Sequence, residues 1–369
     1  MKSAQSNEKI YNIQALRGVA AIAVLLAHLG GAERDYGNPI RIIPGWFEIG
    51  VSGVDLFFLI SGFVMIHVAG NNSKPAQKPS HFLFNRAARI YPLYWVMTLA
   101  ILVLYAGKAF FFAEATPLNN IIASFLLLPS NHLPILNVGW TLVYEMYFYL
   151  IFAGFIWVSV KHLPIMLSVW SALLLVANIG GLVDLNAVTA VVFSPLTFEF
   201  IAGCLIAMLL QRHFTEHAWK ALFTGIAIFA LLATGLITPL NEALYANFDR
   251  RILFFGPPFA LILYGAVAME MRSQRKAPAW LIKAGDISYA LYLVHIPVFL
   301  VVGKTLSLIQ IGGALHNLLI ITISPIVAIS VAVIAHKWIE KPALRYTKKL
   351  GARLFKTPRS QALSAKNAA

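Results

Sequence analysis

The sequence predicts an all-α polytopic membrane protein with about ten transmembrane helices and with both termini in the cytoplasm. Of its 369 residues, 59% are hydrophobic and only 12% are charged, whereas an ordinary soluble domain carries about 25% charged residues. Such a chain has too little polar surface to face water on all sides. The lipid bilayer is therefore the expected solvent for most of it.

Ten apolar stretches approach the length of about 20 residues that a membrane-spanning helix needs. They are residues 13–29, 50–69, 91–112, 137–160, 163–180, 193–211, 219–238, 252–271, 286–303 and 314–336. An eleventh run, 121–129, is too short to span and predicts a re-entrant or interfacial piece. Residues 1–344 are thus expected to form an integral membrane domain. Residues 345–369, rich in Lys, Arg, Ser and Ala, are expected to form a basic, disordered cytoplasmic tail.

The distribution of Lys and Arg predicts the orientation, because cytoplasmic loops retain these residues. With ten spans and an inside N-terminus, 23 of the 29 Lys and Arg fall on the inner side. The outer segments then hold Arg34, Arg41, Lys108, Arg250, Arg251 and Lys304. A signal peptide at 13–29 is the alternative to a first span, but its apolar region runs into His28.

The net charge of +14 does not indicate a nucleic-acid-binding protein. Such a protein needs a basic face interleaved with polar or aromatic residues, and here the basic residues stand between long apolar runs. The one cysteine, Cys204, lies inside an apolar run. Disulfides and a cysteine-based metal site are therefore excluded.

Ionisable side chains within spans are costly, so each one is a candidate functional residue. Arg17 and His28 lie eleven residues apart on the first span, about three helical turns and roughly 16 Å, and so point to the same side. Asp55 on the second span is expected at the depth of His28, where a carboxylate can orient an imidazole. The simpler interpretations are an arginine that reaches the headgroups and an aspartate that caps a helix.

Three further buried candidates are Glu145, Glu199 and His295, each of which could instead be a structural hydrogen-bond partner. Tyr292 lies one turn from His295 on the same helix face. Arg86 and Arg89 lie one turn apart at the cytoplasmic boundary of the third span. Two guanidinium groups at that spacing suit a polyphosphate, although membrane anchoring alone would also explain them.

Seven ordered motifs resemble those of the membrane-bound acyltransferase-3 family. They are Arg17-x10-His28, Leu56-Phe57-Phe58-Leu59-Ile60-Ser61-Gly62-Phe63, Arg86-x-x-Arg89-Ile90-Tyr91-Pro92, Gly139-Trp140-Thr141-Leu142-x-x-Glu145, Phe198-Glu199-Phe200-x-x-Gly203, Ile287-Ser288-Tyr289-x-x-Tyr292-x-x-His295 and Glu340-Lys341-Pro342. The segments 11–18 and 134–142 are most similar to bacterial members that acetylate exopolysaccharides. Thr141 and Tyr144 depart from the pattern of many members, which leaves Glu145 as the one carboxylate at that motif.

The resemblance implies acyl transfer, usually of acetyl, from cytoplasmic acyl-coenzyme A to an extracytoplasmic glycan or its lipid-linked precursor. A bacterial inner membrane location and contacts with membrane lipids follow from the same resemblance. It implies no permanently bound cofactor, no metal and no nucleic-acid partner. The oligomeric state stays open.

The expected roles of individual residues follow from the resemblance and the predicted topology together. Arg17, Arg86 and Arg89 are expected to hold the donor phosphates. His28 is expected to act as general base or as transient acyl carrier. Asp55 and Glu145 complete the predicted catalytic set. Trp140, Tyr144, Glu199, Tyr292 and His295 are expected to line the acceptor site.

Two other functions compete with this hypothesis. A transporter or flippase would also place charges within spans, but such proteins often have repeated halves with broken helices, which this sequence lacks. An acyltransferase acting on a lipid headgroup or a small metabolite would carry the same donor motifs. Product analysis separates that enzyme from one that modifies a polymer.

Overall fold

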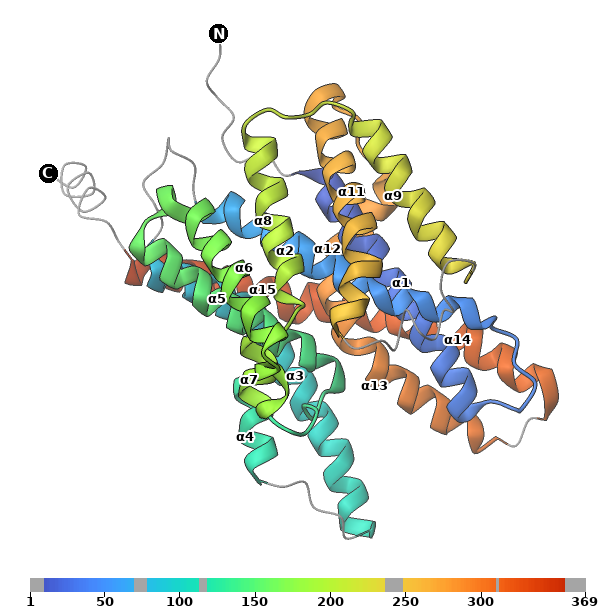
Figure 1. The fold of residues 1–369 in the computed structure, drawn as a ribbon. Coiled ribbons are helices and arrows are strands. Elements are labelled where there is room, and N and C mark those ends of the chain that lie inside the picture. The colour runs from blue at the N-terminus through green and yellow to red at the C-terminus, as the bar shows by residue number, and fades with distance from the viewer. Residues whose placement is uncertain (1–9, 70–77, 113–117, 236–247, 310–311, 356–369) are drawn as a thin grey trace, which may run out of the picture.

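The computed structural model describes residues 10–69, 78–112, 118–235, 248–309 and 312–355, and their regular structure is helical throughout. Figure 1 shows long helices packed side by side, with the short helices α4 (Leu118–Leu126) and α7 (Ala187–Val192) towards one end of the view. The long helices are α1 (Tyr11–Tyr36), α2 (Gly53–Ala69), α3 (Pro79–Phe112), α5 (Trp140–Val158), α6 (Leu163–Ile179), α8 (Thr197–Gln211), α9 (Ala218–Ala233), α11 (Phe248–Ser273), α13 (Ser288–Ser307) and α14 (Gly313–Ala335). The other short ones are α12 (Ala279–Asp286) and α15 (Lys341–Leu354).

The predicted fold class, an all-helical multi-pass membrane protein, is confirmed. Within the described residues, nine helical stretches are long and apolar enough to cross a bilayer. The tenth expected span, 219–238, corresponds to α9, which is apolar but only 16 residues long. Residues 236–238 of that span lie outside the described part of the chain.

Helix α15 corrects the expectation of a disordered tail that begins at residue 345. Residues Lys341–Leu354 continue from α14 through a π-helical turn at His336–Glu340. The helix is amphipathic: one face is covered by α3, where a Cβ on Gly351 would touch Phe84, and the other carries its Lys and Arg side chains. The sequence did not predict this helix because its mean hydropathy is low: its apolar residues occupy one face only. Residues 356–369 of the expected tail lie outside the described residues.

The short apolar run at 121–129 corresponds mainly to helix α4, which packs on α3. The last carbonyl groups of a helix have no hydrogen-bond donor within that helix. Here three side chains of α3 donate to carbonyl groups at the end of α4. Tyr94 donates to the carbonyl of Ser124 (2.7 Å), Trp95 to that of Phe125 (2.8 Å) and Tyr91 to that of Leu126 (3.0 Å). These bonds fix the end of α4 against the bundle.

Helices α2 and α8 cross in close contact because both contribute a glycine at the crossing. A Cβ on Gly62 would overlap the carbonyl oxygen of Phe200, and one on Gly203 would overlap that of Leu59. The Cys204 thiol donates to the carbonyl of Gly62 at 3.2 Å. Small residues at such crossings let membrane helices gain packing energy where no hydrophobic driving force exists. The crossing fixes Asp55 and Glu199 on neighbouring helices.

Glu270 near the end of α11 caps the first turn of α1. Its two carboxylate oxygens accept from the backbone N–H groups of Tyr11 (2.9 Å) and Asn12 (2.7 Å). The Asn12 side chain also donates to the carbonyl of Ala266 at 2.7 Å. A carboxylate at a helix N-terminus satisfies free donors and matches the helix dipole. The start of α1 is thus tied to α11.

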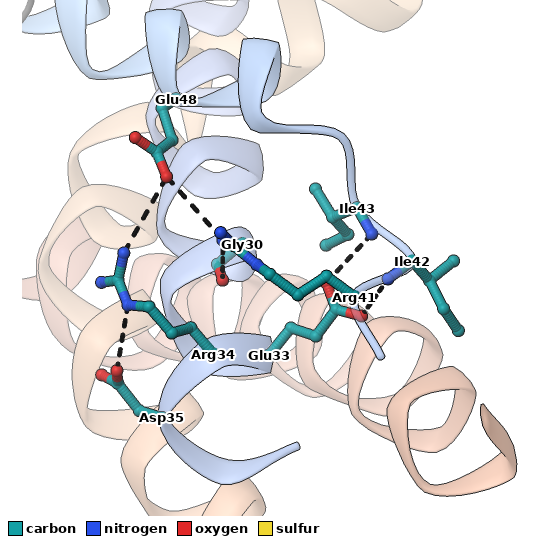
Figure 2. Close-up of polar contacts among 8 residues, drawn as sticks. All are labelled: Gly30, Glu33, Arg34, Asp35, Arg41, Ile42, Ile43 and Glu48. Carbon is teal, nitrogen blue, oxygen red and sulfur yellow. Dashed lines mark hydrogen bonds and ion pairs between the residues drawn. The ribbon is translucent and has the colours of Figure 1, made fainter. Parts of the chain in front are cut away.

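A second carboxylate, Glu33, organises the opposite end of α1 (Figure 2). This completely buried side chain accepts from the backbone N–H groups of Ile42 (2.6 Å) and Ile43 (3.0 Å). On the exposed side of the same loop, Arg34 and Arg41 both approach Glu48, at 3.9 and 3.8 Å. The connection from α1 to α2 is therefore anchored to α1 by polar contacts.

Candidate active site

The first of two cavities, here called the arginine cavity, has a volume of about 800 Å³ with the space at its mouth included. It is bounded by the N-terminal parts of α1, α3 and α13 and by α2 and α5. Arg17, Arg86 and Arg89 all line it. The structure thus brings together the three arginines that the sequence singled out.

The arginines have few partners within the described residues. Arg17 makes one long contact with Gln14, at 3.5 Å. The Nε atom of Arg86 is buried without a hydrogen-bond partner there, and its guanidinium carbon lies 5.9 Å from the centre of the Tyr149 ring. Clustered cations repel one another, so an anion in this cavity would relieve that repulsion and provide acceptors for their donors.

Glu145 lies in the arginine cavity, although the sequence analysis grouped it with the catalytic histidine. Its carboxylate accepts hydrogen bonds from Ser61, at 2.9 Å, and from Tyr149. Along α5 it follows Tyr144 directly and so points about 100° away from it. That rotation directs Tyr144 to the second cavity and Glu145 to the first.

The second cavity, here called the histidine cavity, has a volume of about 1390 Å³ with its open space included. His28 lines it together with Trp140 and Tyr144 at the start of α5 and with Arg251 at the start of α11. Residues 128–134 after α4 form much of the remaining wall. The two cavities share no lining residue.

His28 has a fixed tautomer. Its Nδ1 lies 2.8 Å from the carbonyl oxygen of Val24. A carbonyl can only accept, so Nδ1 carries the proton and Nε2 of the neutral ring keeps its lone pair. The His28 ring lies edge-on to the ring of His295, with centres 4.9 Å apart. The site therefore holds two histidines in contact.

The sequence suggested that Asp55 orients His28. In the structure Asp55 instead pairs with Arg251. Arg251 Nε donates to Oδ1 at 3.0 Å, and Nη2 donates to Oδ2 at 2.7 Å. Nη2 also donates to the carbonyl of Val51 at 3.2 Å. Both side chains are buried. His28 takes its orienting bond from its own helix, because the Val24 carbonyl lies one turn below it.

Glu199 is buried at 1% exposure and lies close enough to Asp55 and Arg251 to interact electrostatically with both. It lines neither of the two cavities. Arg251 was counted as an outer-loop residue in the sequence analysis. The structure corrects this, because the side chain turns inward at the first turn of α11 and is only 6% exposed.

Tyr292 belongs to the wall between the two cavities. Its hydroxyl donates to the carbonyl of Val138 (3.0 Å) and shares a hydrogen bond with Thr141 (2.9 Å). Tyr292 and Thr141 line the arginine cavity, whereas Val138 lines the histidine cavity. One turn further along α13, His295 contacts His28. The hydrogen-bonded side chains of Tyr292 and Thr141, with the Val138 carbonyl, thus lie at the boundary between the two cavities.

Comparison with known proteins identifies the family. The sequence profile of the acyltransferase domain known as acyltransferase-3 matches residues 10–337. This chain belongs to the acyltransferase-3 family. The matched range includes both cavities, so the acyltransferase domain occupies nearly all of the described membrane bundle.

Three relatives of this acyltransferase are similar over most of its length. The exopolysaccharide production protein ExoZ of Rhizobium meliloti (strain 1021) is 30% identical over 81% of this chain and 91% of its own length. The acyltransferase MdmB of Streptomyces mycarofaciens is 26% identical over 78% of each protein. The peptidoglycan O-acetyltransferase OatA of Listeria monocytogenes is 24% identical over 83% of this chain and 52% of its own length. No solved structure gives a significant match.

Three side chains of the acyltransferase site were missed by sequence reasoning. Ser61 and Tyr149 bind Glu145, and Arg251 binds Asp55. Tyr149 carried a usable signal, since it lies one turn after Glu145 on the same helix face. Ser61 lies within the second of the family motifs, but its contact with Glu145 arises only from the packing of α2 on α5.

The buried pair of Asp55 and Arg251 generates a stability prediction for this acyltransferase. Asp55→Ala removes the bidentate partner of the buried Arg251 guanidinium, and we expect a loss of about 3–5 kcal/mol in the free energy of unfolding. Double replacement, Asp55→Ala with Arg251→Met, removes both members of the pair and should cost less than the sum of the two single replacements, while the neighbouring Glu199 is present in every variant. Reversible unfolding of the purified protein in mixed detergent micelles measures the two single variants and the double variant.

Arg34→Ala provides the control, because it removes an exposed ion pair with Asp35. Such pairs contribute less than about 1 kcal/mol. A double replacement that destabilises by the sum of the two single replacements would show that Asp55 and Arg251 do not act as a pair.

Proposed function

We propose that this acyltransferase moves an acetyl group from cytoplasmic acetyl-coenzyme A to a hydroxyl of an extracytoplasmic glycan. The acceptor would be an exopolysaccharide or its lipid-linked precursor, and the protein would lie in the bacterial inner membrane. The observation that best supports this proposal is the pair of cavities, one lined by three arginines and one by His28, which meet at the hydrogen bond between Tyr292 and the Val138 carbonyl. The similarity to ExoZ and OatA supports the choice of acetyl and glycan.

The arginine cavity suits the donor. Coenzyme A carries a pyrophosphate and a further phosphate, and arginine forks are the preferred partners of such groups. An excess of Lys and Arg on the arginine-cavity side of the membrane would place that cavity at the cytoplasmic face. The thin pantetheine arm would then extend past Tyr292 towards His28, so that the nucleotide stays behind.

The histidine cavity suits the acceptor. Trp140 and Tyr144 offer aromatic surfaces with polar edges to a sugar. The lone pair on Nε2 of His28 can take the proton of a hydroxyl that attacks the thioester, or can itself carry the acyl group in two steps. Both routes use the same nitrogen, and both need the tautomer that the Val24 carbonyl fixes.

We expect the double variant Arg86→Ala with Arg89→Ala to bind acetyl-coenzyme A at least ten-fold more weakly, because two phosphate partners are lost. Isothermal titration of the purified protein in detergent measures this. Arg212→Ala, an exposed arginine at the end of α8, is the matched control and should bind as the wild type does. Unchanged affinity in the double variant would leave these arginines as membrane anchors only.

The function itself is tested in cells. Deletion of the protein should remove ester-linked acetyl groups from the surface glycan, as measured by NMR, and the wild-type protein should restore them. His28→Ala should fail to restore them while it is inserted and binds donor normally, because base catalysis alone contributes about 10²–10⁴-fold. Normal acetylation with His28→Ala would contradict the central role of His28. If the deletion instead removed acetyl groups from a lipid or a small metabolite and left the glycan esters intact, the acceptor would be that lipid or metabolite and not a glycan.

A further inference from the structure

His295 is a second histidine at the junction of the two cavities. Its side chain is 1% exposed and touches the rings of His28 and Phe299. Nδ1 lies 3.2 Å from the carbonyl oxygen of Leu291, so this ring has the same tautomer as His28. Its Nε2 is buried with no hydrogen-bond partner among the described residues.

A buried nitrogen without a partner is costly, by about 1–3 kcal/mol. A purely structural position on α13 would be occupied more favourably by an apolar side chain, because the ring packs against aromatic neighbours. The lone pair of His295 is therefore better explained by a partner that is present only during the reaction. The neighbouring His28 supplies such a partner once it is protonated.

The acceptor and the donor arm reach the acyl carbon from opposite cavities. In the reaction proposed above, on which this inference rests, the acceptor hydroxyl approaches from the histidine cavity and gives its proton to His28. The sulfur bonded to the same acyl carbon lies on the donor side of it, towards Tyr292, and needs a proton when it leaves as a thiolate. His295 lies between the two sides, since Tyr292 on the same helix lines one cavity and Ile296 lines the other.

We propose that His295 is a proton relay that takes the hydroxyl proton from His28 and returns it towards the leaving sulfur. The hydroxyl oxygen forms the new bond to the acyl carbon while its proton moves to Nε2 of His28 and then to Nε2 of His295. The carbon–sulfur bond breaks, and the thiolate receives that proton. Atoms and charge balance without a further reactant. His295 thus acts through His28 and does not hold the donor.

The groups that face this pair are few. Arg251 on α11, Tyr144 on α5 and His132 in the segment after α4 line the cavity of His28, and Tyr292 lies 5.9 Å from His295 by ring centres. Arg251 is held by Asp55, and the hydroxyl of Tyr292 is bound to Val138 and Thr141. His295 is the histidine whose ring contacts that of His28 among the described residues.

The test compares His295→Ala with wild type in a purified transfer assay using acetyl-coenzyme A and isolated glycan. We expect kcat to fall at least 100-fold, with the KM for donor within two-fold of wild type. Added imidazole should restore at least ten-fold of the lost rate, because it fits the vacated space and can carry a proton. Pyrrole, which has the same shape but no basic nitrogen, should restore nothing.

His316→Ala is the matched control, since His316 is also buried and lies on α14 away from both cavities. Its activity should be insensitive to imidazole. His295→Gln keeps the volume of the side chain but cannot relay a proton, so it should be as slow as His295→Ala even if the latter folds poorly. A His295→Gln rate within three-fold of wild type, or equal rescue by pyrrole, would overturn the relay. An inactive wild-type protein would instead overturn the proposed function.

Discussion

The structure depends on how ionisable side chains are held inside an apolar bundle. A lone charge there is costly, and the described core meets this cost in two ways. Asp55 and Arg251 neutralise each other through a bidentate contact, and Glu33 and Glu270 accept backbone donors at the two ends of α1. Arg17, Arg86 and Arg89 line one cavity and His28 lines the other, and these side chains have few hydrogen-bond partners among the described residues. The candidate site is therefore where ionisable side chains face open space.

Helix α1 connects the two halves of that site. Arg17 lies in the arginine cavity and His28 in the histidine cavity, and both ends of the helix are anchored by buried carboxylates. Helix α13 repeats the arrangement, with Tyr292 in the arginine cavity and Ile296 in the histidine cavity. Two rigid helices therefore fix the separation between the place for phosphates and the place for chemistry. Catalysis by positioning needs such fixed spacing.

The sequence predicted the features that depend on local patterns. Hydropathy located the spans, and helical spacing placed Arg17 and His28 along one helix. Sequence-based prediction failed where a contact joins segments that are distant in the chain. Arg251 has the pattern of a loop residue at a helix end, and only the packing of α11 on α2 brings it to Asp55. Helix α15 was missed for a different reason, because its low hydropathy masks an amphipathic pattern. The sequence grouped Glu145 with His28 in the catalytic set, whereas its carboxylate lines the arginine cavity, because a sequence gives the depth of a side chain more readily than its direction.

The central claim is that the acyl group passes from donor to acceptor through the wall between the two cavities. It is tested most directly in sealed proteoliposomes with radiolabelled acetyl-coenzyme A enclosed inside and glycan supplied only outside. We expect labelled glycan outside, produced by the protein molecules whose arginine cavity faces the vesicle interior and lost with His28→Ala. Label that appears only when donor and glycan share one compartment would contradict it.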